Sequence, residues 1–388
     1  MIFENVDIFG RRDLSHIQTE FKYLPLNYVG SKKKILSWIW RSIENKKINF
    51  NTFLDPFAGS GVVSYFMRLL GKQVYSNDLL ISSYYNLLSL VENPNIILTP
   101  QEISWLTSHR VKNGGEGFED IDLQYEDFPH YNEEFFTENY FTQKEAVFLD
   151  CFFYKINILQ NKFKLDDNQI KYKKAICYSA LLAFSNLLPF GSADGSNLFE
   201  YRKKQKDKYK NRCKGFYLDS DYNLHLYWLS NYMEKFSNFA LLTQGTKQGM
   251  AFNQDAFDFL QQDFINDIDV VYFDPPYGGT SSNYVSIYNF LENFIEQKNI
   301  SKYKINAGQK FSSKNYQEHF SNILDLTQNV KTWIFSYNHK SWQGVDEIVA
   351  LIKEYKNDVS YVSHTVTLQD RGNMTKKKDV LEHLIFAQ

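Results

Sequence analysis

The chain has 388 residues, of which 43% are hydrophobic, and its formal net charge is −2. This length allows two domains and a sizeable core, and the near-neutral charge excludes a uniformly polycationic nucleic-acid binder. The start MIFENVDIFGRRDLSH has no apolar signal-peptide core, and no apolar run of about 18 residues could span a bilayer. Three cysteines, Cys151, Cys177 and Cys213, lack metal-ligand spacing. We therefore expect a soluble, cytoplasmic protein without a bound metal.

Residues 24–92 alternate strand-like and helix-like segments, which is typical of a parallel sheet with crossover helices. An amphipathic helix is predicted at 32–43, a strand entering a turn at 51–57, a helix closed by Gly71 at 61–71 and a second strand at 72–79. The sequence thus predicts an α/β fold in its first part.

A glycine turn follows the first predicted strand, in FLDPFAGSG. Gly59 and Gly61 would let a ligand approach the backbone closely, and Asp78 follows Gly59 by 19 residues, where an acid can bind ribose hydroxyls. The full G-x-G-x-x-G fingerprint is missing, and Asp55 would repel a pyrophosphate. A cationic sulfonium ligand fits better, so S-adenosylmethionine is favoured over NAD, and a dehydrogenase is the weakest alternative.

Upstream, NYVGSKKK contains Gly30 and Lys32 without the spacing of a phosphate-binding P-loop. Lys32 could bind the carboxylate of the cofactor, and Tyr28 could pack against it. The competing interpretation is a solvated lysine at the start of a helix.

The middle of the chain, residues 93–246, is predicted to be a mostly helical insertion, with helices at 171–188 and 225–242. The acidic segment 116–138 contains no Lys or Arg, whereas RKKQKDKYKNRCK at 202–214 is strongly basic. Runs of like charge are more often solvated surface than binding sites. The two catalytic parts would then be 1–92 and 247–388, which form one sheet interrupted by the insertion.

After residue 247 the strand pattern resumes at 249–260, 269–277, 331–338, 359–366 and 380–388, and we expect the last two strands to be antiparallel. In DVVYFDPPY a short apolar strand stops at Asp274, Pro275, Pro276 and Tyr277. The prolines stiffen the turn, so the Asp274 carboxylate and the Pro275 carbonyl could both accept hydrogen bonds from an exocyclic amine. Tyr277 could stack on the base.

These motifs, LNYVGSKKKI, FLDPFAGSG, YSNDL and VVYFDPPY in this order, resemble those of Dam-like, alpha-type N(6)-adenine-specific DNA methyltransferases. The tail RGNMTKKKDVLEHLIFAQ is similar to the closing segment of that family. The resemblance implies a Rossmann-like methyltransferase sheet with an inserted, mostly helical target-recognition domain at 93–246. It also implies methyl transfer to the amine of a flipped adenine in double-stranded DNA, with S-adenosylhomocysteine as product and no metal.

The resemblance also assigns site residues. Catalysis would use Asp274, Pro275 and Tyr277, and cofactor binding would use Tyr28, Gly30, Lys32, Asp55, Phe57, Gly59, Gly61, Asp78, Asp255 and Asp274. Arg202, Lys203, Lys204 and Lys206 would contact DNA phosphates. A bacterial, archaeal or viral monomer or weak dimer with a cognate restriction endonuclease is expected. Alternatives are transfer to cytosine or RNA, and an inactive nucleic-acid-binding subunit.

Overall fold

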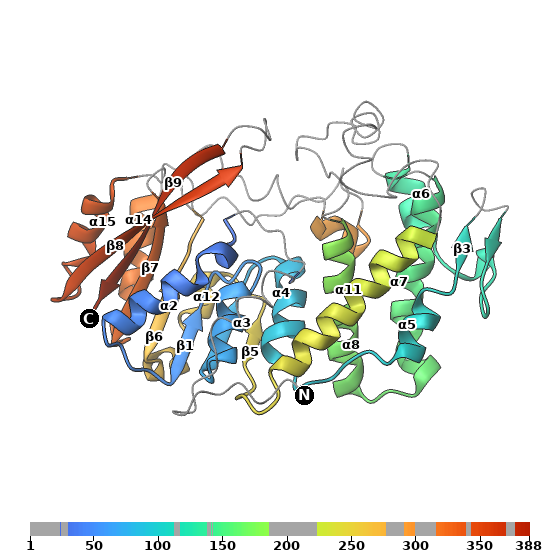
Figure 1. The fold of residues 1–388 in the computed structure, drawn as a ribbon, viewed down its shortest axis with the longest axis horizontal. Helices are drawn as coiled ribbons and strands as arrows, with labels where there is room; N and C mark the ends of the chain where they lie inside the picture. Colours follow the sequence, from blue (N-terminus) through green and yellow to red (C-terminus); the bar gives the residue numbers. More distant parts are fainter. Residues whose placement is uncertain are drawn as a thin grey trace.

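The computed structural model describes residues 24, 30–111, 117–137, 141, 143–185, 223–276, 291–298, 316–338, 343–369 and 377–388. Within these residues the chain forms a seven-stranded sheet, with a second group of helices beside it (Figure 1). The predicted site residues Tyr28 and Tyr277 and the basic residues 202–206 lie outside the described residues.

The seven strands follow the order β5-β2-β1-β6-β7-β9-β8. They are β1 Thr52–Asp55, β2 Gln73–Asn77, β5 Met250–Phe252, β6 Val270–Phe273, β7 Thr332–Asn338, β8 Val359–Gln369 and β9 Lys377–Ala387. The first five in the order pair in parallel, whereas β9 pairs antiparallel with both β7 and β8, which confirms the predicted final pair. Strands β2 and β5 lie on one side of β1, and β6 and β7 lie on the other side. The order of the strands therefore reverses between β1 and β6, and parallel sheets form their ligand crevice at such a point.

The sheet is buried on both faces, because successive residues of its central strands enter different cores. Phe53 packs on one face, with the helices α2 (Leu36–Asn45), α3 (Val62–Leu69) and α4 (Ile81–Leu87). Leu54 packs on the other face, with α12 (Ala256–Phe259), α14 (Tyr316–Leu326) and α15 (Val345–Ile352). In β6, Tyr272 packs on the same face as Phe53, and Phe273 packs on the same face as Leu54. The predicted α/β class and the buried strand before Asp274 are confirmed.

The region between η2 (Leu88–Glu92) and β5 is mostly helical where it is described. Its elements are α5 (Pro100–Leu106), β3 (Arg110–Val111), β4 (Phe118–Glu119), η3 (Tyr125–Asp127), α6 (Tyr131–Phe136), α7 (Gln143–Phe163), α8 (Asp167–Ser185) and α11 (Asn223–Leu242). Figure 1 shows α5, α7, α8 and α11 grouped beside the sheet. The predicted helices at 171–188 and 225–242 correspond to α8 and α11, whereas the domain boundaries at 93 and 246 stay a prediction.

A buried arginine ties both ends of this helical region to α3. The side chain of Arg68 is 1% exposed. Its guanidinium donates to the carbonyls of Leu90 and Asn93, where the chain enters the helical region, at 3.1 and 3.0 Å. It also donates to the carbonyl of Lys247, where the chain leaves the helical region, at 3.2 Å. Burial lowers the pKa of Arg68 to about 10, so the group stays charged at neutral pH. Arg68 therefore links the two connections of the helical region to α3, beside other contacts such as the hydrogen bond from Tyr65 Oη to the carbonyl of Phe239.

Several acids of the segment 116–138 have partners inside the helical region. Asp120 pairs with the fully buried Lys155 and accepts a hydrogen bond from Ser108 Oγ at 2.7 Å. Asp122 pairs with Lys162 at 2.7 Å. Asp120 is therefore an internal acid of the helical region, whereas the Asp122–Lys162 pair lies at the surface.

The stretch 249–260 is not one strand, as the sequence pattern had suggested. Strand β5 ends at Phe252, and α12 begins after Asp255. The Asp255 carboxylate accepts a hydrogen bond from the backbone N–H of Phe257 at 2.9 Å, which caps the helix. The strand prediction is therefore wrong beyond Phe252. Among the described residues, no helix is long and apolar enough to cross a membrane.

Candidate cofactor and catalytic site

Three predicted carboxylates meet at one edge of the sheet. Asp55 is the last residue of β1, Asp78 directly follows β2, and Asp274 directly follows β6. Parallel strands end on the same edge, so their last residues lie close together. The negative charges of Asp274 and Asp78 both act on the Asp55 carboxyl. The structure thus places these residues, which are far apart in the sequence, in one site.

The glycine turn links two of these strands. Gly59 has φ 53° and Gly61 has φ 74°, conformations that favour glycine. A Cβ atom on Gly61 would also lie 2.8 Å from Leu87 Cδ2. The backbone N–H of Gly59 donates to Asp78 Oδ2 at 2.7 Å. The turn that opens α3 is therefore held against the acid that follows β2.

Asp55 is a buried carboxyl with one unsatisfied oxygen. It is 1% exposed, and its Oδ2 accepts a hydrogen bond from Ser64 Oγ at 2.7 Å. Its Oδ1 is buried and has no hydrogen-bond partner among the described residues. Burial, reinforced by the charges of Asp274 and Asp78, raises the pKa of Asp55 to about 8. Such a group gains a partner when a cationic ligand binds beside it.

Asp78 is held by backbone N–H groups at both oxygens. Besides the bond from Gly59, its Oδ1 accepts from Leu80 N at 2.9 Å. Burial nevertheless raises the pKa of Asp78 to about 6. Each carboxylate oxygen has a further lone pair, so ribose hydroxyls could still donate to it. The next residue, Leu79, is 40% exposed and was not among the predicted site residues.

A buried asparagine connects this turn to the end of β5. The amide nitrogen of Asn77 donates to the carbonyls of Pro56 and Gln254 at 3.3 and 3.0 Å, and its oxygen accepts from Gln254 N at 3.0 Å. This brings Asp255, the next residue, to the same edge of the sheet. Asn77 lies in the motif YSNDL just before Asp78, so its position was a usable signal that sequence reasoning did not use.

The predicted catalytic turn, residues 274–277, is joined to the amino-terminal motif by an ion pair. Lys32 Nζ lies 3.1 Å from Asp274 Oδ1 and 3.7 Å from Glu382 Oε2, and Lys32 is 5% exposed. Burial alone would lower the pKa of Lys32, but the charges of Asp274 and Glu382 outweigh it and raise the pKa. The alternative interpretation of Lys32 as a solvated lysine is therefore wrong. Glu382 was not among the predicted site residues.

The remaining predicted residues have simpler positions. Gly30 adopts φ 80° two residues before the η1 turn (Lys32–Lys34). Phe57 packs against the core on the α14 face, and Pro275 is buried. Tyr28, Tyr277 and the DNA-binding candidates Arg202, Lys203, Lys204 and Lys206 lie outside the described residues, so their assignments stay predictions.

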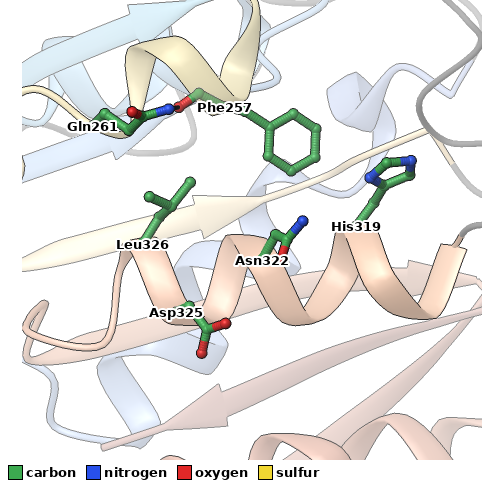
Figure 2. Close-up of a pocket in the computed structure, with 6 residues that line it drawn as sticks. All are labelled: Phe257, Gln261, His319, Asn322, Asp325 and Leu326. Carbon is green, nitrogen blue, oxygen red and sulfur yellow. Dashed lines mark hydrogen bonds between the residues drawn. The ribbon is translucent and has the colours of Figure 1, made fainter.

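A cavity of about 410 Å³ lies between α12 and α14, on the outer side of the sheet. Figure 2 shows Phe257 and Gln261 on one wall, opposite His319, Asn322, Asp325 and Leu326 of α14. The rings of Phe257 and His319 are 5.5 Å apart between centroids. None of the predicted cofactor or catalytic residues lines this cavity.

Comparison with known proteins agrees with this geometry. The chain is similar to the type II methyltransferase M2.HphI of Haemophilus parahaemolyticus, with 26% identity over 93% of this chain and 97% of that protein. It is also similar to the modification methylase StsI of Streptococcus sanguinis (24% identity) and the type II methyltransferase M.FokI of Planomicrobium okeanokoites (25%). These two alignments each cover 94% of this chain but 52% of the relative, so the chain spans about half their length.

A family model supplies the assignment. The model of the D12 class N6 adenine-specific DNA methyltransferases matches residues 28–348, a span that includes the amino-terminal motif, the glycine turn, the helical region and the catalytic turn. The sheet order and the site at its carboxyl edge fit a Rossmann-like methyltransferase. The chain therefore belongs to the D12 class of N6 adenine-specific DNA methyltransferases.

Proposed function

We propose that the three-carboxylate site transfers the methyl group of S-adenosylmethionine to the exocyclic amine of an adenine flipped out of duplex DNA. The observation that carries this proposal is the position of Asp274, directly after β6, within interaction distance of Lys32 and in the same site as Asp55 and Asp78. An acceptor for the amine and acids for the cofactor are thereby held on one rigid edge.

Asp274 and Pro275 would act on the amine. The nitrogen of an aromatic amine is a poor nucleophile because its lone pair is delocalised into the ring. Hydrogen bonds from its two N–H groups to the Asp274 carboxylate and the Pro275 carbonyl favour a tetrahedral nitrogen whose lone pair can attack. Tyr277 would stack on the flipped base, a contact that contributes about 1–3 kcal/mol in single-strand binding.

The cofactor-binding assignments fit the donors and acceptors present. Bound S-adenosylmethionine supplies a methyl group already activated by a positive sulfur, so this chemistry requires no metal. Asp78 would accept the ribose hydroxyls, and Leu79 and Asp255 would lie at the adenine. Asp55, Phe57, Gly59 and Gly61 would surround the amino-acid end, with the unsatisfied Asp55 Oδ1 as acceptor, and Tyr28, Gly30 and Lys32 would close it.

The affinity for S-adenosylmethionine is expected to rise with pH. Asp55, with a pKa of about 8, and Asp78, with a pKa of about 6, bind protons in the free protein. A cationic ligand favours their ionised forms, so binding releases protons and strengthens by at most about tenfold per pH unit for each proton released. Asp55→Asn should remove the part of this rise between pH 7 and 8 and leave the part near pH 6.

Isothermal titration calorimetry of both proteins from pH 5.5 to 8.5, in buffers of different ionisation enthalpy, measures the affinity and the number of protons released. The cofactor's own amino group titrates identically in both series, so the difference between the curves isolates Asp55. Parallel affinity curves for the wild type and Asp55→Asn would contradict this linkage.

Arg202, Lys203, Lys204 and Lys206 are proposed to contact DNA phosphates, on the basis of their clustered charge and their place in the inserted region. Reversing two charges, with Lys203→Glu and Lys204→Glu, is expected to weaken duplex binding and to reduce the slope of log affinity against log salt by about two. Fluorescence anisotropy at several salt concentrations measures both effects. An unchanged slope would indicate that these residues are solvated surface and do not contact the DNA phosphates.

A cytoplasmic role in restriction and modification is part of the same proposal, and the names of the relatives, type II methyltransferases and a modification methylase, support it. A cognate restriction endonuclease would recognise the sequence that this protein methylates. The protein itself would act as a monomer or weak dimer, which sedimentation velocity at several concentrations can measure.

The activity is tested with tritiated S-adenosylmethionine and duplex DNA, followed by nucleoside analysis and by single-molecule sequencing of DNA from expressing cells. The proposal requires N6-methyladenine in one sequence context. Label on cytosine or only on RNA would show that the protein methylates another substrate. DNA binding without any transfer would show an inactive nucleic-acid-binding subunit.

A further inference from the structure

Glu382 lies beside the catalytic turn although it comes from the last strand of the sheet. In β9 it is the register partner of Asn338, the last residue of β7. Asn338 Nδ2 donates to Glu382 Oε1 at 2.7 Å, which leaves Glu382 Oε2 for Lys32 at 3.7 Å. Glu382 is 8% exposed. A chain of polar contacts therefore runs from β7 through Glu382 and Lys32 to Asp274.

The charges of Lys32, Asp274 and Glu382 do not cancel. One ammonium, that of Lys32, lies between two carboxylates, those of Asp274 and Glu382. If Lys32 faced Asp274 alone, the two opposite charges would neutralise each other beside the reacting amine. With Glu382 present, the group of three carries a net negative charge. Among the described residues, the other titratable groups that interact with Asp274 include the buried phenols of Tyr272 and Tyr316 and the carboxyl of Asp55.

We propose that Glu382 is a positioning residue for methyl transfer, which holds the Lys32 ammonium against Asp274 Oδ1 and keeps the catalytic turn net negative. Held in this way, Asp274 presents its second oxygen to the amine in a fixed orientation. This inference rests on the proposed function of Asp274 and adds to it a residue that lies outside the catalytic tetrapeptide.

The net charge matters at the moment of transfer. In the transfer the carbon–sulfur bond would break and leave a neutral thioether, while the new carbon–nitrogen bond would leave a positive charge on the adenine nitrogen until one of its protons passes to solvent water. A fixed negative charge next to that nitrogen stabilises the developing positive charge, and in a site sheltered from water this effect is large. A pair of Lys32 and Asp274 without Glu382 would supply less of it.

Two substitutions separate the charge of Glu382 from its shape. Glu382→Gln keeps the length and an oxygen that can accept from Asn338, but removes the charge. Glu382→Asp keeps the charge but is shorter by one methylene. The positioning role predicts that kcat falls roughly tenfold or more in Glu382→Gln and only a few-fold in Glu382→Asp. A role in packing alone predicts the reverse order, because the shorter side chain leaves a gap.

The pH profile is a second readout. In Glu382→Gln the buried Lys32 keeps Asp274 as its carboxylate partner among the described residues, so its ammonium should lose its proton at a lower pH than in the wild type. A neutral Lys32 no longer holds Asp274 Oδ1 by an ion pair, so kcat should decline at alkaline pH where the wild type stays active. Asp379→Asn is the matched control, because Asp379 is an exposed acid on the same strand, bonded to Thr367 instead of Lys32. Its kcat and pH profile should match the wild type.

The measurements are single-turnover rates at saturating cofactor and DNA, with thermal unfolding as a check on folding. A Glu382→Gln variant with wild-type kcat and pH profile, or a kcat order in which Gln exceeds Asp, would overturn the positioning role while leaving the function of Asp274 intact. If Glu382→Gln does not fold, Glu382→Asp decides the question, because a fall in its kcat of more than a few-fold would overturn the positioning role. Wild-type turnover in an Asp274 variant would instead remove the proposed function itself.

Discussion

Replacing Asp274 with alanine is expected to lower the rate of methyl transfer by about 1,000-fold or more, since the amine loses its charged acceptor. Pro275 would still accept one hydrogen bond, so a trace of activity can remain. Asp274→Asn should be nearly as inactive, because its amide offers a neutral oxygen and a competing N–H. The measurement is the single-turnover rate at saturating S-adenosylmethionine, so that weaker cofactor binding does not disguise the chemical step.

The control for this loss is Asp258→Ala, which removes an exposed acid elsewhere in the catalytic part of the chain. It should transfer methyl groups at the wild-type rate. Circular dichroism of the Asp274 variants should show the native fold, because Asp274 is in a loop and lies outside both cores. Wild-type turnover by Asp274→Ala would exclude the carboxylate from the mechanism.

Arg68→Ala is expected to reduce the free energy of unfolding by about 4 kcal/mol, a large share of the stability of an ordinary domain. The substitution leaves the carbonyls of Leu90, Asn93 and Lys247 without their donor, and hydrogen bonds to a charged group contribute about 1.5–3 kcal/mol each before relaxation. It also leaves a cavity under α3. Arg68→Lys should be intermediate, because one ammonium cannot reproduce the fork of the guanidinium.

Urea denaturation followed by circular dichroism measures this loss. Arg41→Ala, which removes an exposed arginine from the neighbouring helix α2, should change the stability by less than about 0.5 kcal/mol. If Arg68→Ala were equally mild, the two connections of the helical region would be held by other contacts, and the anchoring role of Arg68 would be wrong.

The features that the sequence predicted correctly have local signals. The buried strand before Asp274, the glycine turn after Asp55 and the acid at Asp78 each depend on neighbouring residues whose backbone preferences agree. The helices α8 and α11 were likewise visible as long apolar and amphipathic stretches. The stretch 249–260 was misread because an apolar run suits a strand or a helix equally well, and the capping bond of Asp255 decided between them.

The charged partners, by contrast, could not be derived from the sequence. The acidic segment resembled a solvated surface until Asp120 was found paired with Lys155, 35 residues away. Lys32 and Glu382 are separated by almost the whole chain, and nothing near either residue indicates the other. The same holds for Arg68 and its carbonyl partners, whose positions are set by how the helical region returns to the sheet.

By itself, then, the sequence determined the strand-to-turn motifs, the order of the motifs and the chemistry that their residues permit, because a turn is specified by the few residues that form it. Only the tertiary structure decided which carboxylates share a lysine, which acids are internal and which buried carboxylate oxygens, such as Asp55 Oδ1, have no hydrogen-bond partner among the described residues. The physical reason is that charge interactions depend on distance and burial in space, and these exist only after distant segments have packed together.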